Sequence, residues 1–77
     1  MTIEQSAKIY AIKYVLDLNS FKKNERMRED LTWTSIKHHN DKKFERLTEK
    51  YISEIRNRKE TPMWVRILMA ERYKIYL

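Results

Sequence analysis

Apolar residues recur along residues 2–18 with the three- and four-residue spacing of an amphipathic helix. Thr2 and Gln5 fit a capping box at the start of this helix. With about 100° of rotation per residue, the apolar positions fall on two stripes that lie roughly opposite each other. The first stripe, which we expect to face the core, holds Ile3, Ala7, Tyr10, Ala11, Tyr14, Val15 and Leu18, and the second holds Ile9, Ile12 and Leu16.

A helix with two apolar faces needs something to pack against on each side. The simpler interpretation makes it the central helix of its own domain. The alternative makes Ile9, Ile12 and Leu16 a protein interface, with a second copy of the chain or with another protein. A domain of 77 residues has few layers in which to bury both faces, which gives the alternative a physical basis.

A second helix is predicted over residues 25–39, after a charged loop, with Asn24 or Asp30 as its cap. Its second half is the least regular part of the chain, because residues 32–36 include β-branched and aromatic side chains that suit a strand. No other segment offers a convincing strand to pair with it, and an isolated strand is not stable. We therefore expect a helix there as well.

Two better-patterned helices follow. Asn40 or Asp41 starts a helix over residues 41–58, and Thr61 caps a helix over residues 62–76 that has Pro62 at its first position. The last helix has apolar side chains on nearly every side, so we expect it to be buried or to contact a partner. The helix over 41–58 has a single apolar stripe, at Phe44, Leu47, Tyr51, Ile52 and Ile55.

These elements predict an all-α fold, a compact bundle of three or four helices that forms a single domain over residues 1–77. The composition agrees, because the chain has no glycine and only one proline, Pro62. Glycine supplies the positive-φ turns, phosphate-binding loops and tight catalytic turns of many active sites, so its absence argues against them. No Ser/His/Asp or Cys/His arrangement is evident either. We expect a binding protein, not an enzyme, that uses no cofactor.

Charge is the main indication of a partner. Seventeen Lys and Arg against eleven Asp and Glu give a net charge of +6, which attracts polyanions or acidic protein surfaces. Lys42, Arg46 and Lys50 recur every four residues and form a cationic ridge that could follow a phosphate backbone. A solvated helix face is the alternative, since acidic residues lie on the same helix. The candidate nucleic-acid-binding residues are Lys22, Lys23, Arg26, Arg28, Lys37, Lys42, Lys43, Arg46 and Lys50.

Several single residues allow narrower predictions. Phe21 lies within the first basic cluster and could stack on a base, but we expect it to fill the core. His38 and His39 are adjacent, so on a helix they point in different directions, and with no third ligand nearby we expect no metal site. Arg72 lies on the strongest apolar stripe of the last helix and, if buried, needs an acidic partner, for which Glu4, Asp17 and Glu29 are candidates.

The sequence gives only general indications of where in the cell the protein is located. The chain has no cysteine, no signal-peptide pattern and no stretch near the roughly 18 apolar residues of a spanning helix, so we expect a cytoplasmic protein that is not in a membrane. In size, basicity and helical character it is similar to the small accessory proteins of phages and other mobile elements, many of which bind a host enzyme or nucleoprotein. That similarity is one of general character and rests on no motif.

Two functions remain open. In the first, two basic segments, Lys22 to Arg28 and Lys37 to Lys50, converge on one side and bind RNA, DNA or a nucleoprotein, mostly through phosphate. In the second, the chain is a stoichiometric inhibitor or adaptor that docks on a host protein through apolar and basic helix surfaces. Homo-oligomer formation is a further expectation, because so small a core gives little stability by itself.

Overall fold

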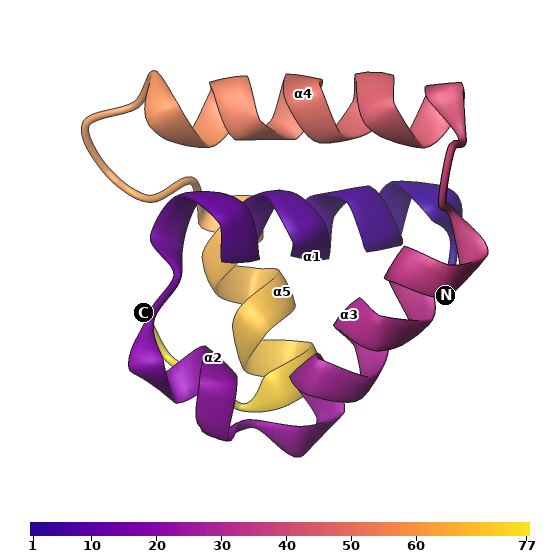
Figure 1. The fold of residues 1–77 in the computed structure, drawn as a ribbon. Coiled ribbons are helices and arrows are strands. Elements are labelled where there is room, and N and C mark those ends of the chain that lie inside the picture. The colour runs from indigo at the N-terminus through magenta and orange to yellow at the C-terminus, as the bar shows by residue number, and fades with distance from the viewer.

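Five helices and no strands make up the computed structural model, which describes all 77 residues (Figure 1). The all-helical class predicted from the sequence is confirmed. The radius of gyration is 11.7 Å, close to the value of about 11.5 Å expected for a folded chain of this length. The helices are α1 (Ile3–Leu16), α2 (Asn19–Lys23), α3 (Glu25–Lys37), α4 (Lys42–Arg56) and α5 (Met63–Tyr73).

The central element is α1. α4 lies along one side of it and runs in the same direction, while α2, α3 and α5 lie on its other side (Figure 1). Because α1 is covered on both sides, both of its apolar stripes contribute to the core: Ala7 and Ala11 from one stripe and Ile9 and Ile12 from the other are 0% exposed. Tyr10 and Tyr14 of the first stripe were expected to face the core, but they are 38% and 59% exposed.

The core takes side chains from every helix. Phe21 of α2 is 1% exposed, so it fills the core as expected and is not available to stack on a base. α5 is buried on one side only, because Met63 and Ile67 on its other side are exposed. The buried apolar residues are Ala7, Ile9, Ala11, Ile12, Phe21, Met27, Tyr51, Ile55, Val65, Met69 and Tyr73.

Side chains cap three helices at the predicted starts. Thr2 Oγ1 accepts a hydrogen bond from the Gln5 N–H at 3.1 Å. Asn24 Oδ1 accepts one from the Met27 N–H at 2.9 Å, and Asp41 Oδ1 accepts one from the Lys43 N–H at 2.9 Å. The capping prediction for Thr61 is wrong, because Pro62 itself occupies the cap position of α5 and no side chain caps that helix.

Three residues have a left-handed backbone in this chain without glycine: Asp17 at φ 41°, Asn40 at φ 65° and Lys74 at φ 56°. Asp17 ends α1 after Leu16, so the helix predicted over 2–18 is shorter at its end. The Lys13 ammonium pairs with the Asp17 carboxylate. The chain then turns and forms the short helix α2 where a loop was predicted.

A polar cluster joins α3 to α5. Arg72 Nε donates to Asp30 Oδ2 at 2.7 Å and the Tyr73 hydroxyl donates to the same oxygen at 2.6 Å. The predicted acidic partners of Arg72 were therefore wrong, since the partner is Asp30. Burial raises the pKa of the Asp30 carboxyl, but the hydrogen bonds from Arg72 and Tyr73 outweigh it and the pKa lies below its ordinary value. Burial, and then Asp30, raise the pKa of Tyr73.

Candidate nucleic-acid interface

All nine predicted nucleic-acid-binding residues are exposed. None of them takes part in an ion pair, because the ion pairs of the structure join Lys13 to Asp17, His38 to Asp41 and Arg72 to Asp30. A cation that is not held in an ion pair is free to contact a phosphate. The side chains are distributed over α2 (Lys22 and Lys23), α3 (Arg26, Arg28 and Lys37) and α4 (Lys42, Lys43, Arg46 and Lys50).

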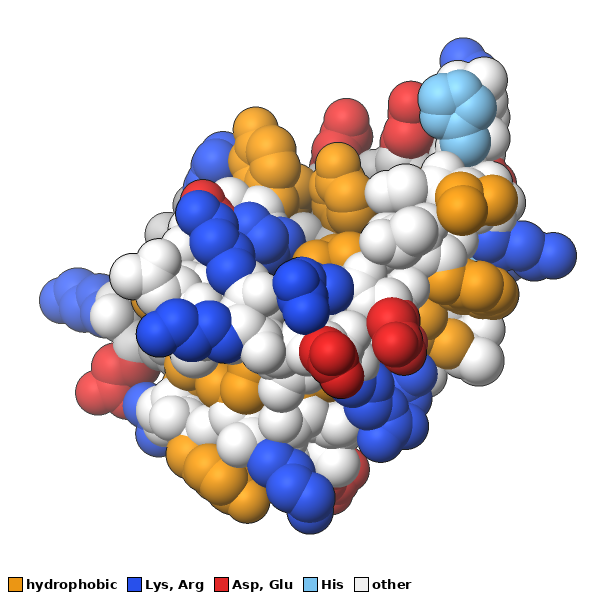
Figure 2. Space-filling model, turned by 60° about the horizontal axis from the view of Figure 1, so that its bottom comes forward, with side chains coloured by type: hydrophobic (Ala, Val, Ile, Leu, Met, Phe, Trp, Pro, Cys, Tyr) orange, Lys and Arg blue, Asp and Glu red, His pale blue; other side chains and the backbone are white.

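The helices that carry most of these cations lie apart in the fold. α2 and the start of α3 lie on the opposite side of α1 from α4 (Figure 1). We call Lys22, Lys23, Arg26 and Arg28 the α2–α3 cluster, and Lys42, Lys43, Arg46 and Lys50 the α4 ridge. Figure 2 turns the bottom of the molecule toward the viewer, and Lys and Arg side chains gather there with acidic and hydrophobic ones among them.

Three cations of the α4 ridge share one flank of the helix. Its inner face packs Tyr51 and Ile55 into the core. At 3.6 residues per turn, Lys43, Arg46 and Lys50 lie on one flank of the outer surface, while Glu45 and Glu49 lie on the other. Lys42 projects between the two flanks, and Glu54 follows Lys50 one turn later on the cationic flank. The basic strip therefore runs from Lys43 to Lys50 and ends at Glu54.

Aromatic rings lie under several cations near α4. Lys50 Nζ is 5.6 Å from the centre of the Tyr51 ring, and the Arg56 guanidinium carbon is 5.4 Å from the centre of the Tyr14 ring. Tyr51 is buried, whereas Tyr14 is exposed on α1. Tyr14 is thus a ring beside a cation that sequence reasoning missed, because the apolar stripe assigned it to the core. Its contact with Arg56, on a neighbouring helix, could be found only from the tertiary structure.

The predicted protein interface on α1 is corrected by the burial of its residues. Ile9 and Ile12 are 0% exposed, and Leu16 is partly buried against the core. A partner could not contact Ile9 or Ile12 without opening the domain, so the central-helix interpretation applies to them. The exposed apolar side chains lie elsewhere, including Trp33 at 41% and Ile36 at 77% on α3.

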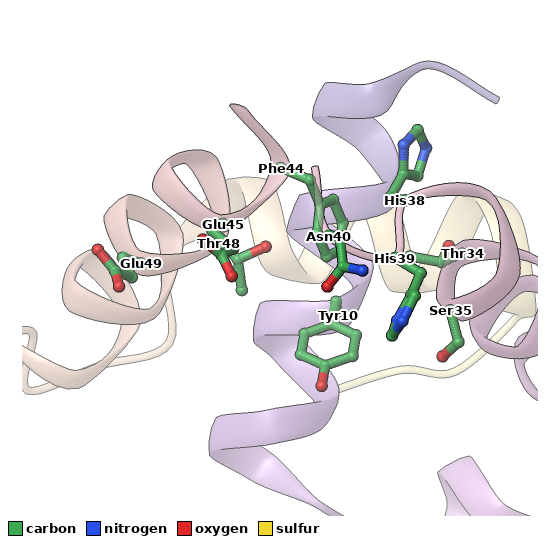
Figure 3. A pocket seen from close by; sticks show the side chains of 10 residues that line it. All are labelled: Tyr10, Thr34, Ser35, His38, His39, Asn40, Phe44, Glu45, Thr48 and Glu49. Atoms are coloured by element: carbon green, nitrogen blue, oxygen red, sulfur yellow. The ribbon is translucent and has the colours of Figure 1, made fainter. Parts of the chain in front are cut away.

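A polar pocket of about 470 Å³ opens between α3, α4 and α1 (Figure 3). We call it the α3–α4 pocket. One wall consists of Glu45, Thr48 and Glu49 on α4, and the opposite wall comes from α3 and the turn after it (Figure 3). No lysine or arginine lines it. The remaining lining residues are Tyr10, Thr34, Ser35, His38, His39, Asn40 and Phe44.

The two histidines beside this pocket have different surroundings. His38 is stacked on Phe44, with ring centres 5.2 Å apart and an interplanar angle of 11°, and its Nδ1 lies 3.9 Å from Asp41 Oδ2. His39 is exposed and points away from His38 (Figure 3). The structure has no group of three or more His, Cys, Asp or Glu side chains arranged to hold a metal ion.

The chain matches no protein-family model, no curated protein and no solved structure. None of its helices combines the length and the apolar character that crossing a membrane requires.

Proposed function

We propose that this chain is a non-enzymatic binding protein of the cytoplasm that contacts RNA or DNA, free or in a nucleoprotein, through the α4 ridge. One observation carries the proposal: the four cations of the ridge are exposed and free of ion pairs on a helix of 15 residues. The contacts are with phosphate, so we expect weak sequence preference.

The dimensions of the ridge suit a phosphate backbone. Lys42 and Lys50 are eight residues apart, which at 1.5 Å per residue is about 12 Å along the helix axis. One strand of duplex DNA carries a phosphate about every 3.4 Å along its axis, so the ridge spans about three to four phosphates. Ser53 and Asn57 continue beyond Lys50, but their side chains bond to each other at 3.0 Å.

The salt dependence of binding tests this proposal. If the four cations each neutralise one phosphate, the logarithm of the association constant for duplex DNA should fall against the logarithm of salt concentration with a slope of about −3.6. The triple variant Lys42→Gln, Arg46→Gln, Lys50→Gln should bring that slope to about −1, because about one unit is lost for each phosphate contact. Fluorescence anisotropy with labelled RNA and DNA of random sequence measures both slopes.

A charge-matched control separates the ridge from the general field of a basic protein. The triple variant Lys22→Gln, Lys23→Gln, Arg26→Gln removes the same three charges from the α2–α3 cluster. It should keep most of the salt slope. Equal losses in the two triple variants would mean that only net charge matters, and an unchanged slope in the α4 variant would contradict the proposal. Circular dichroism of each variant establishes that it is folded.

A protein inhibitor or adaptor is the second candidate, and the observation that favours it is the exposed apolar surface of α3. Trp33 and Ile36 lie one turn apart there and are accessible, unlike the buried isoleucines of α1. Copurification from native cells distinguishes the two functions. A stoichiometric protein that stays bound after nuclease and high salt, and is lost in Trp33→Ser, supports the adaptor.

A further inference from the structure

We propose that the α3–α4 pocket binds a guanidinium group, namely the arginine side chain of a protein partner. The inference is independent of the α4 ridge, because no residue of the ridge lines the pocket. It rests on three features of the pocket: unpaired carboxylates, buried hydroxyls without hydrogen-bond partners, and an accessible aromatic ring.

The carboxylates make the pocket acidic within a basic protein. Glu45 and Glu49 lie one turn apart on α4, and neither forms an ion pair although the chain has 17 lysines and arginines. Like charges four residues apart on a helix repel each other. A cation between them would relieve that repulsion, and no lysine or arginine of α4 lines the pocket.

Buried hydroxyls on both walls point to a ligand with several donors. Thr34 on α3 is 0% exposed and Thr48 on α4 is 7% exposed, and neither Oγ1 atom has a hydrogen-bond partner. Buried polar atoms are nearly always hydrogen-bonded in native proteins, so two unpartnered hydroxyls beside one pocket indicate that a polar group completes the site.

The geometry favours guanidinium over a smaller cation. Acceptors lie on opposite walls, with Glu45 and Thr48 on one and Thr34 on the other (Figure 3). A guanidinium presents five N–H donors in a planar fork, whereas an ammonium is a compact point charge that engages one acceptor cluster. The Tyr10 ring, 38% exposed and edge-on to Phe44 at 5.7 Å, offers a π face to a planar cation.

The site is open to solvent, which favours a side chain delivered by a protein over a free metabolite. Glu45, Glu49 and His39 on its rim are all exposed. A free guanidinium compound would bury little of its surface there, and small ligands depend on such burial for affinity. An arginine carried by a larger partner gains additional contacts around the rim.

Titration of the intact protein, followed by the amide signals in a proton–nitrogen NMR spectrum, tests the proposal. The probes are N-acetyl-arginine amide, its lysine counterpart and its uncharged citrulline counterpart. Arginine should produce saturable shifts at Thr34, Asn40 and Glu45, with at least fivefold weaker binding of lysine and no saturation by citrulline. Attaching the arginine to a short neutral peptide should tighten binding severalfold, which distinguishes a protein-borne side chain from the free compound.

Matched variants complete the test. Glu45→Gln with Glu49→Gln should weaken arginine binding at least tenfold, whereas Glu54→Gln with Glu60→Gln, which removes the same charge elsewhere, should leave it unchanged. Thr48→Val keeps the shape of the side chain and should weaken binding several-fold. The proposal is overturned if lysine or citrulline binds as well as arginine, or if both double variants behave alike. The proposal is also overturned if arginine gives no saturable shift in the folded wild-type protein.

Discussion

At the residue scale, the burial of the second α1 stripe predicts that an Ile→Ala substitution there lowers the free energy of unfolding far more than the same substitution at the surface. Ile12→Ala removes a side chain that is 0% exposed, so we expect the free energy of unfolding to fall by about 2–5 kcal/mol. Ile36→Ala changes a side chain that is 77% exposed and should alter stability by less than about 0.5 kcal/mol. Urea denaturation measures both. Similar losses for the two variants would show that Ile12 is not in the core.

Asp30 predicts a dependence of stability on pH. Its pKa is lower in the folded chain than the ordinary value of 3.8, so its contribution is present above that value and is lost as the pH falls through the folded-state pKa. Asp30→Asn should lower stability by about 2 kcal/mol at pH 7, because hydrogen bonds to a charged carboxylate are lost. The difference from the wild type should shrink below pH 3.8, as measured by thermal melts. A difference that stays constant down to strong acid would contradict this.

Individual residues were predictable from the sequence where local chemistry decides their role. Phe21 was correctly expected in the core, and Thr2 was correctly expected as a cap. The partner of Arg72 was not predictable, because Asp30 is 42 residues away and helix periodicity does not show which faces of α3 and α5 meet. Tyr14 was misplaced for a similar reason: a stripe gives the direction of a side chain but not how far the neighbouring helix extends over it.

At the element scale, Asn24 caps α3 and also ties it to α5. Its Oδ1 accepts from the Met27 N–H, while its Nδ2 donates to the Tyr73 carbonyl at 3.0 Å. Asn24→Ala should therefore cost about 2 kcal/mol, more than the loss of a cap alone. Asn24→Ser keeps a capping oxygen and loses the donor, so its cost should be about half as large. Thermal melts followed by circular dichroism give both values, and equal costs would mean that the bond to α5 contributes nothing.

The elements themselves were largely predictable. Four of the five helices follow from apolar spacing and caps, including the region of α3 whose residues also suit a strand. The ends were less accurate, because Asp17 and Lys74 adopt left-handed conformations that end α1 and α5 before the apolar pattern stops. α2 was missed because its 5 residues contain one apolar side chain, Phe21, which is too few for a period.

At the scale of the whole molecule, α5 completes a core that is otherwise open. Val65, Met69 and Tyr73 contribute buried side chains from this helix. A chain shortened to end at Arg58 should lose its cooperative thermal transition, since so small a domain has little stability to spare. A chain that lacks only the exposed Tyr76 and Leu77 should keep that transition. Calorimetry distinguishes the two, and cooperative melting of the shorter chain would contradict this role of α5.

The candidate site was predictable in composition but not in arrangement. Every candidate nucleic-acid-binding residue is exposed, yet the placement of their helices on opposite sides of α1 depends on how the helices pack. The α3–α4 pocket was not predicted at all, because its walls come from residues that are far from Tyr10 in sequence. A helical projection of α4 by itself would have shown that Glu45 and Glu49 point away from Lys43, Arg46 and Lys50.

The left-handed residues have an evolutionary consequence. For a residue with a Cβ atom this conformation costs roughly 1–2 kcal/mol relative to the right-handed one, and glycine would avoid that cost. The Asp17 carboxylate has a use there, since it pairs with Lys13, whereas Lys74 has no ion-pair or hydrogen-bond partner for its side chain. The substitution Lys74→Gly, which needs two nucleotide changes, would therefore raise stability, and that reserve could offset later destabilising changes on the binding faces.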